Sequence, residues 1–202
     1  MVLKRFYRRL RYGTPVVVVS GLPRSGTSMA MKMLEAGGLQ VVTDHERTAD
    51  EDNPKGYLED ERVKDLAEMD DKSWIRDARG RAIKVISFLL KDLPRDNNYK
   101  VIFMRRDLEE VLASQKKMLE RRGEGDETSD DRMTDAYRDH LWRVNWLLKN
   151  DPAFEAIDVQ YRDVLEEPGP QARRIAAFLG GGLPVERMTA VVDESLYRNR
   201  AS

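Results

Sequence analysis

The feature that most constrains the fold is a run of β-branched residues that leads directly into a loop bracketed by two glycines. Residues 15–20 read Pro-Val-Val-Val-Val-Ser, and residues 21–28 read Gly-Leu-Pro-Arg-Ser-Gly-Thr-Ser. An uninterrupted β-branched run is typical of a strand buried on both faces, as in a parallel sheet. The Gly-x-x-x-x-Gly spacing lets the backbone curl, so that the N–H groups of the loop and of a following helix point at an anion. The segment therefore predicts a phosphate-binding loop.

The rest of the chain alternates short apolar segments with helical ones. Further strands are expected at 39–42, 82–87, 99–104 and 154–160, and helices at 27–36, 59–70, 108–121, 134–150, 170–179 and 185–192. This alternation predicts an α/β fold, a three-layer sandwich of the P-loop nucleotide-binding type with a central parallel sheet of about five strands. Because no repeat or linker divides the sequence, we expect one domain over residues 1–202, with 1–13 as a basic N-terminal appendage.

The composition excludes several kinds of site and partner. The 202 residues include 35 Lys and Arg against 36 Asp and Glu, for a net charge of -1, which disfavours a dedicated nucleic-acid binder. With no cysteine, the chain has no disulfide, thiol nucleophile or thiolate metal site, which fits a reducing compartment. No apolar stretch has the length of a transmembrane helix or follows the basic N-terminus as in a signal peptide. We therefore expect a cytoplasmic protein.

The basic N-terminus has two interpretations. It carries Lys4, Arg5, Arg8, Arg9 and Arg11. These charges fit a weak contact with an anionic membrane surface or with a partner. A solvated helix or a frayed terminus is the alternative. The sequence does not predict an oligomeric state.

The glycine loop differs from nucleoside-triphosphate loops in its charged residues. Those loops place a lysine before the last Ser or Thr, whereas this chain has Thr27 there and a cation, Arg24, inside the loop. The apolar strand expected at 99–104 runs into two arginines instead of a carboxylate that would hold magnesium. The sequence thus predicts an anion site built from arginine and backbone without a metal, and it disfavours a small-molecule kinase that uses ATP and magnesium.

Two segments carry a family resemblance. The glycine loop resembles the 5′-phosphosulfate-binding loop of sulfotransferases that use 3′-phosphoadenosine 5′-phosphosulfate (PAPS). Residues 101–114, Val-Ile-Phe-Met-Arg-Arg-Asp-Leu-Glu-Glu-Val-Leu-Ala-Ser, resemble the segment that holds the 3′-phosphate of this donor through an Arg and a Ser eight residues later. Arg106 and Ser114 have that spacing, and they offer a bidentate clamp and a hydroxyl donor. Weaker resemblances at 53–59, 159–168 and 176–180 follow in the family's order, as in a small bacterial-type member.

The resemblance implies metal-independent, in-line transfer of a sulfuryl group from PAPS to a hydroxyl or amine of a small molecule, lipid or glycan. Positioned cations and N–H groups then supply most of the catalysis. The residues it assigns to the donor are Pro23, Arg24, Ser25, Gly26, Thr27, Ser28, Arg106, Ser114 and Tyr161. Tyr161 is placed at the adenine end, with a role in the core as the alternative.

The catalytic residues are less completely defined. The family places a lysine near the sulfuryl group, and Lys84 at a predicted strand end matches it; a solvated lysine is the alternative. The histidine that many members have two residues later is Ile86 here. The candidate bases are therefore Glu46, then His45, then Glu59, with Arg24 as a further catalytic cation. A nucleotide-binding protein without turnover stays open as an alternative function, as does the kinase.

Other prominent side chains receive structural roles. Trp142 and Trp146, at helical spacing, are predicted to lie in the core rather than to form an acceptor platform. His140 is also predicted to be structural. Arg198 and Arg200 are either further contacts to the 3′-phosphate or part of a charged tail.

Overall fold

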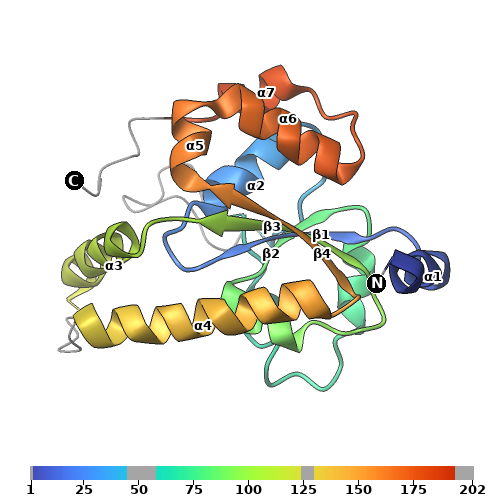
Figure 1. Cartoon of the computed structure of the whole chain (residues 1–202), viewed down its shortest axis with the longest axis horizontal. Helices are drawn as coiled ribbons and strands as arrows, with labels where there is room; N and C mark the ends of the chain where they lie inside the picture. Colours follow the sequence, from blue (N-terminus) through green and yellow to red (C-terminus); the bar gives the residue numbers. More distant parts are fainter. Residues whose placement is uncertain (1, 45–57, 124–129, 194–202) are drawn as a thin grey trace.

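A computed structural model describes residues 2–44, 58–123 and 130–193 (Figure 1). Within them, four strands form one parallel sheet in the order β2-β1-β3-β4. The strands are β1 (Val16–Gly21), β2 (Ala82–Lys84), β3 (Tyr99–Arg105) and β4 (Phe154–Gln160). Because every pair is parallel, the strands all end at the same edge of the sheet. Open α/β sheets bind their ligands at that edge.

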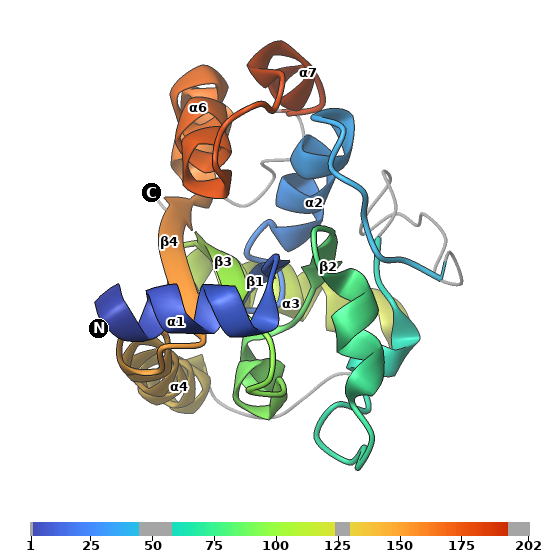
Figure 2. The ribbon, with the colours of Figure 1, turned by 90° about the vertical axis from the view of Figure 1, so that its right-hand side faces the viewer.

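Helices cover both faces of this sheet (Figures 1 and 2). One face packs against α2 (Thr27–Ala36), α6 (Pro168–Leu179) and α7 (Val185–Ala190). The other packs against α4 (Asp130–Asn150) and the 3-10 segments η2 (Ser73–Ala78) and η3 (Ser87–Asp92). The remaining described elements are α1 (Val2–Tyr12), η1 (Glu61–Val63), α3 (Leu108–Arg122) and α5 (Tyr161–Glu166). The predicted three-layer α/β sandwich is confirmed.

The valines of β1 fill both layers of the core. Val17 and Val19 pack with α2 and α6, whereas Val16 and Val18 pack with the cluster on the opposite face. Successive side chains of a strand point to opposite faces, so a strand covered on both sides needs apolar residues at every position. The position of β1 between β2 and β3 thus explains its unbroken β-branched sequence.

The sheet is narrower than predicted because the segment 39–42 does not become a strand. It makes only one isolated bridge, from Val41 to Ala82. The Val42 N–H donates to the Ala82 carbonyl at 2.7 Å, but β2 itself pairs with β1 over only three residues. The ladder is therefore too short for a fifth strand.

Two helical predictions also change. The helix expected at 59–70 forms only the 3-10 turn η1, where the Asp60 side chain accepts a hydrogen bond from the Arg62 N–H, followed by turns. The short helix α5 directly follows β4, in a segment for which the sequence predicts no helix.

The prediction that Trp142 and Trp146 lie in the core is wrong. Their exposed fractions are 68% and 60%. The buried side of α4 instead carries Tyr137, Val144 and Leu148. Residues two positions apart lie on nearly opposite sides of a helix, so the stripe of Val144 and Leu148 turns both tryptophans outward.

Candidate functional site

The glycine loop joins the carboxyl end of β1 to the N-terminus of α2. Gly21 is the last residue of β1, and Gly26, with φ of 95°, caps α2. A Cβ on Gly26 would collide with the ring of Tyr161, and one on Gly21 would come within 2.7 Å of the Met104 carbonyl. Ser25 Oγ, which is buried, donates to the Leu22 carbonyl at 2.7 Å and closes the turn. Both glycines are therefore required by close approach, and the loop is compact.

Arg24 connects this loop to α3. It has a positive φ of 66°, which is uncommon for a residue with a side chain. Its Nε donates to Ser114 Oγ at 3.1 Å, so a loop residue and a residue of the second turn of α3 touch. The sequence predicts Arg24 at the 5′-phosphosulfate and Ser114 at the 3′-phosphate of one donor. The structure brings their side chains into direct contact.

Arg106, at the end of β3, holds the loop from the other side. Its Nη1 donates to the Arg24 carbonyl at 3.0 Å, and its Nε donates to Glu110 Oε2 at 2.9 Å. The guanidinium carbon lies 4.5 Å from the centre of the Tyr161 ring, a cation–π contact. The ring of Tyr161 thus contacts both Gly26 and Arg106. Five of the predicted donor residues form one cluster: Arg24, Gly26, Arg106, Ser114 and Tyr161.

Glu110 is the functional neighbour that sequence reasoning missed. Its side chain and that of Arg106 are 5% and 7% exposed, so the two form a buried ion pair. The signal was present in the i, i+4 spacing at the start of a helix, which brings such side chains together. Glu110 therefore holds the guanidinium of Arg106 in place, and removing either partner would leave the other charge buried and unpaired.

Lys84 forms a second cluster beside the loop. From the end of β2, its Nζ donates to Ser28 Oγ at 3.0 Å and pairs with Glu59 Oε1 at 2.7 Å. Both charged side chains are partly buried. Lys84 is therefore not a solvated strand-end lysine. A cation and a carboxylate stand next to the first turn of α2.

The remaining predicted residues are distributed as follows. Pro23 and Thr27 lie half-buried in the loop and at the start of α2. Glu46 and His45 fall outside the described residues, as do Arg198 and Arg200. Ile86 directly precedes η3, so no imidazole follows Lys84 at that position. Among the described residues, no group of three or more His, Asp or Glu side chains is arranged to hold a metal ion.

Burial shifts the pKa of two titratable groups, Tyr161 in the site and His140 on α4. Burial raises the pKa of the Tyr161 phenol, although the charge of Arg106 opposes the rise. Burial, helped by the charge of Arg143, lowers the pKa of His140. The His140 ring stacks on Phe88 with centroids 3.8 Å apart, and its Nε2 lies 2.8 Å from Ser87 Oγ. These contacts agree with the structural role predicted for His140.

A comparison with models of protein families shows to which family this chain is related. The model of the sulfotransferase family matches residues 70–186. The chain belongs to the sulfotransferase family. The matched segment contains Lys84, Arg106, Ser114 and Tyr161, whereas the glycine loop precedes it. No match is found among the curated proteins.

A solved structure supports the fold of this sulfotransferase-family chain. The sulfotransferase domain from the curacin biosynthetic pathway is 15% identical, with 91% of this chain and 89% of that chain covered and a TM-score of 0.52. At this identity the likeness concerns the fold. Within the described residues, no helix is both long and apolar enough to cross a bilayer.

The contact between Gly26 and Tyr161 generates a prediction about stability. Gly26→Ala adds a Cβ that collides with the ring and also forces alanine into a positive φ, so we expect a loss of about 2–4 kcal/mol in the free energy of unfolding. Gly38→Ala is the matched control. Gly38 has φ of 86° but no atom within 4 Å of the added Cβ, so only the strain, about 1 kcal/mol, applies. Urea unfolding of both variants measures the difference, and equal losses would show that the close approach is unimportant.

Proposed function

We propose that this chain transfers a sulfuryl group from PAPS to a hydroxyl or amine of an acceptor, without a metal. The observation that carries the proposal is the single cluster formed by Arg24, Arg106, Ser114 and the glycine loop. In the sulfotransferase family resemblance, these residues belong to the two phosphate sites of one donor. Their mutual contacts support the proposal, because a bisphosphorylated nucleotide would need two anion sites close together.

The 3′-phosphate is assigned to Arg106 and Ser114. The guanidinium of Arg106 is held by Glu110 and by the Arg24 carbonyl, so its orientation is set before a ligand arrives. Preorganised donors lose less side-chain entropy on binding and therefore contribute more to affinity. Ser114 contributes a hydroxyl, with Arg24 already hydrogen-bonded to it.

The 5′-phosphosulfate is assigned to the loop itself. A helix N-terminus offers N–H groups and a partial positive charge to an anion, and Gly21 and Gly26 allow the loop to curve tightly before α2. Lys84 brings a full positive charge to Ser28 at the first turn of that helix. When bound there, PAPS would supply the sulfuryl group, and the residues of this chain would stabilise the charge that develops on its oxygens.

The proton of the acceptor needs a base, and the described geometry supports Glu59. Its carboxylate lies 2.7 Å from Lys84 Nζ, which is itself 3.0 Å from Ser28 Oγ. A sulfuryl group held between Ser28 and Lys84 would therefore lie close to this carboxylate. Glu46 and His45 remain candidates from the sequence.

Sulfuryl transfer from labelled PAPS to a panel of hydroxyl and amine acceptors tests the activity. We expect labelled product from at least one acceptor class with magnesium chelated. Donor binding without transfer to any acceptor would instead support a nucleotide-binding protein without turnover.

The same assay tests Glu59. If Glu59 is the base, Glu59→Gln keeps a hydrogen-bond partner for Lys84 but cannot take a proton, so kcat should fall about 100-fold or more with donor affinity nearly unchanged. Glu61→Gln is the control, because Glu61 is exposed and pairs with Lys64 on the same segment. A kcat that matches the control would exclude Glu59 and leave Glu46 and His45.

The assignment of the 3′-phosphate is tested by Ser114→Ala. Loss of one hydroxyl donor should weaken 3′,5′-adenosine bisphosphate about tenfold and leave adenosine 5′-monophosphate within about twofold. Calorimetric titration of both ligands gives the ratio. Ser114→Ala is preferred to Arg106→Ala, because the latter would leave the carboxylate of Glu110 buried and unpaired. Equal weakening of the two ligands would contradict the assignment.

A further inference from the structure

The N-terminal helix α1 presents an apolar stripe to solvent. Leu3, Phe6, Tyr7 and Leu10 are 84%, 64%, 60% and 72% exposed. Their spacing is i, i+3, i+4 and i+7, and with successive residues about 100° apart they share one face of the helix. These side chains belong to none of the core clusters of the described residues. Four large apolar side chains on one exposed face indicate a surface that binds something.

The charges of α1 have one sign. Its sequence, Val-Leu-Lys-Arg-Phe-Tyr-Arg-Arg-Leu-Arg-Tyr, contains five basic residues and no acidic residue. Arg9 and Arg11, in the last turn, are exposed. Because the whole chain has a net charge of -1, this helix is a local concentration of positive charge rather than a sample of the average surface. An apolar stripe with only positive charge around it fits a partner that has both an apolar region and negative charge.

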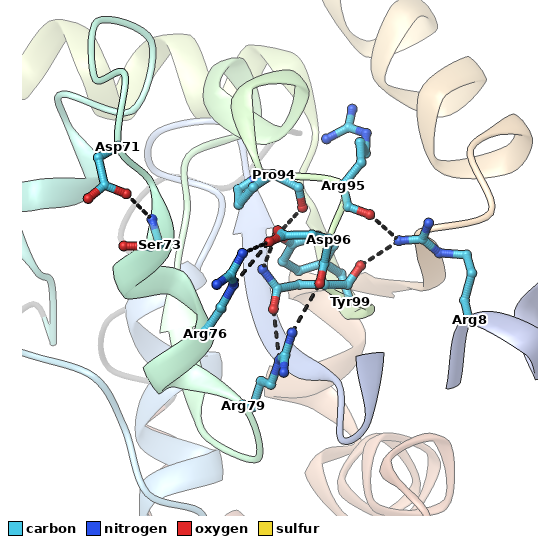
Figure 3. A network of polar contacts seen from close by, with 10 residues as sticks. Arg8, Asp71, Ser73, Arg76, Arg79, Pro94, Arg95, Asp96 and Tyr99 are labelled. Atoms are coloured by element: carbon cyan, nitrogen blue, oxygen red, sulfur yellow. Dashed lines mark hydrogen bonds and ion pairs between the residues drawn. The ribbon is translucent and has the colours of Figure 1, made fainter. Parts of the chain in front are cut away.

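A polar anchor holds α1 on the body of the protein with this stripe outward. Arg8 lies on the side of the helix roughly opposite the stripe, and its Nη2 donates to the Arg95 and Asn97 carbonyls, both at 2.7 Å (Figure 3). The Arg8 carbonyl accepts from Asn98 Nδ2 at 3.1 Å.

The receiving loop is itself fixed. Asp96 pairs with Arg76, the Arg79 Nε donates to Asn97 Oδ1 at 2.8 Å, and the Tyr99 hydroxyl donates to the Pro94 carbonyl at 2.7 Å (Figure 3). This network therefore sets the orientation of α1, in which its apolar face is exposed to solvent.

The helix lies at the end of the sheet away from the donor loop. It precedes the amino end of β1, whereas the glycine loop follows its carboxyl end, and Figure 1 shows α1 and α3 at opposite ends of the sheet. A surface that bound α1 would therefore not cover the donor loop. The role of α1 would be to place the protein at a surface rather than to pass an acceptor directly into the site.

We propose that α1 is an interfacial helix that binds the surface of an anionic phospholipid bilayer. Leu3, Phe6 and Leu10 enter the boundary between headgroups and acyl chains, and Arg9 and Arg11 contact the lipid phosphates. The contrast with α4 supports this choice of partner. The exposed tryptophans of α4 have Arg138, Asp139 and Arg143 in the same segment, so mixed charges surround them. Only α1 combines an exposed apolar stripe with an uninterrupted positive charge among the described helices.

Co-sedimentation of the full chain with lipid vesicles tests the proposal. We expect binding to vesicles of phosphatidylcholine with phosphatidylserine, at least about tenfold weaker binding to phosphatidylcholine alone, and weakening by added salt. The affinity of Leu3→Ser/Phe6→Ser/Leu10→Ser for the anionic vesicles should fall about tenfold or more, because the apolar contact is removed. The affinity of Arg9→Glu/Arg11→Glu should fall as much, because positive charge is replaced by negative charge. Trp142→Ser/Trp146→Ser removes an exposed apolar pair elsewhere and should bind like the unmodified chain.

Three outcomes would overturn the proposal. The first is no binding of the unmodified chain to the anionic vesicles. The second is an equal loss in the Trp142→Ser/Trp146→Ser control, which would indicate non-specific adsorption. The third is that the unmodified chain does not bind vesicles and that the α1 variants differ from it in oligomeric state by size-exclusion chromatography. That result would make the stripe a contact between copies of the chain. Thermal unfolding of each variant shows that the folded body is unchanged.

Discussion

Arg106 holds together three parts of the candidate site that are distant in the sequence. Its guanidinium binds the carbonyl of Arg24 in the glycine loop, the carboxylate of Glu110 in α3 and the ring of Tyr161 at the start of α5. A buried cation must be paired to be tolerated, and here the pairing also fixes the shape of the loop. Tyr161 in turn fills the space that a side chain at position 26 would need. The proposed donor site is thus preformed by contacts within the protein.

The fold places these parts at one edge. The loops after β1, β2 and β3 meet there because the strands are parallel, which brings Lys84 to Ser28 and Arg106 to Arg24. The two clusters differ in character. The side chains of the Arg106–Glu110 pair are almost fully buried, whereas those of Lys84 and Glu59 are more exposed. This difference suits a site in which the donor is held firmly and the reacting end stays accessible to an acceptor.

The elements that could be predicted from sequence are those with a strong local signal. The valine run before Gly21 predicted β1, and the apolar run at 99–104 and the helical pattern at 108–121 predicted β3 and α3 in nearly the observed places. The failures depend on tertiary context. Trp142 and Trp146 have helical spacing, but Val144 and Leu148, which have the same spacing on another side of α4, are the residues that are buried. The local sequence does not determine which of two apolar stripes faces the core. Glu110 was missed because its importance arises from burial, which spacing alone does not reveal.

The central claim is that the glycine loop and Arg106 form a metal-free site for a nucleotide with a 5′-phosphosulfate and a 3′-phosphate. Thermal unfolding with 3′,5′-adenosine bisphosphate in the presence of a chelator tests it most directly, beside ATP with excess magnesium. Because any ligand bound only by the folded state raises stability, the account predicts stabilisation by the bisphosphate. Magnesium should not change this stabilisation. Stabilisation by ATP alone, and only with magnesium, would contradict it.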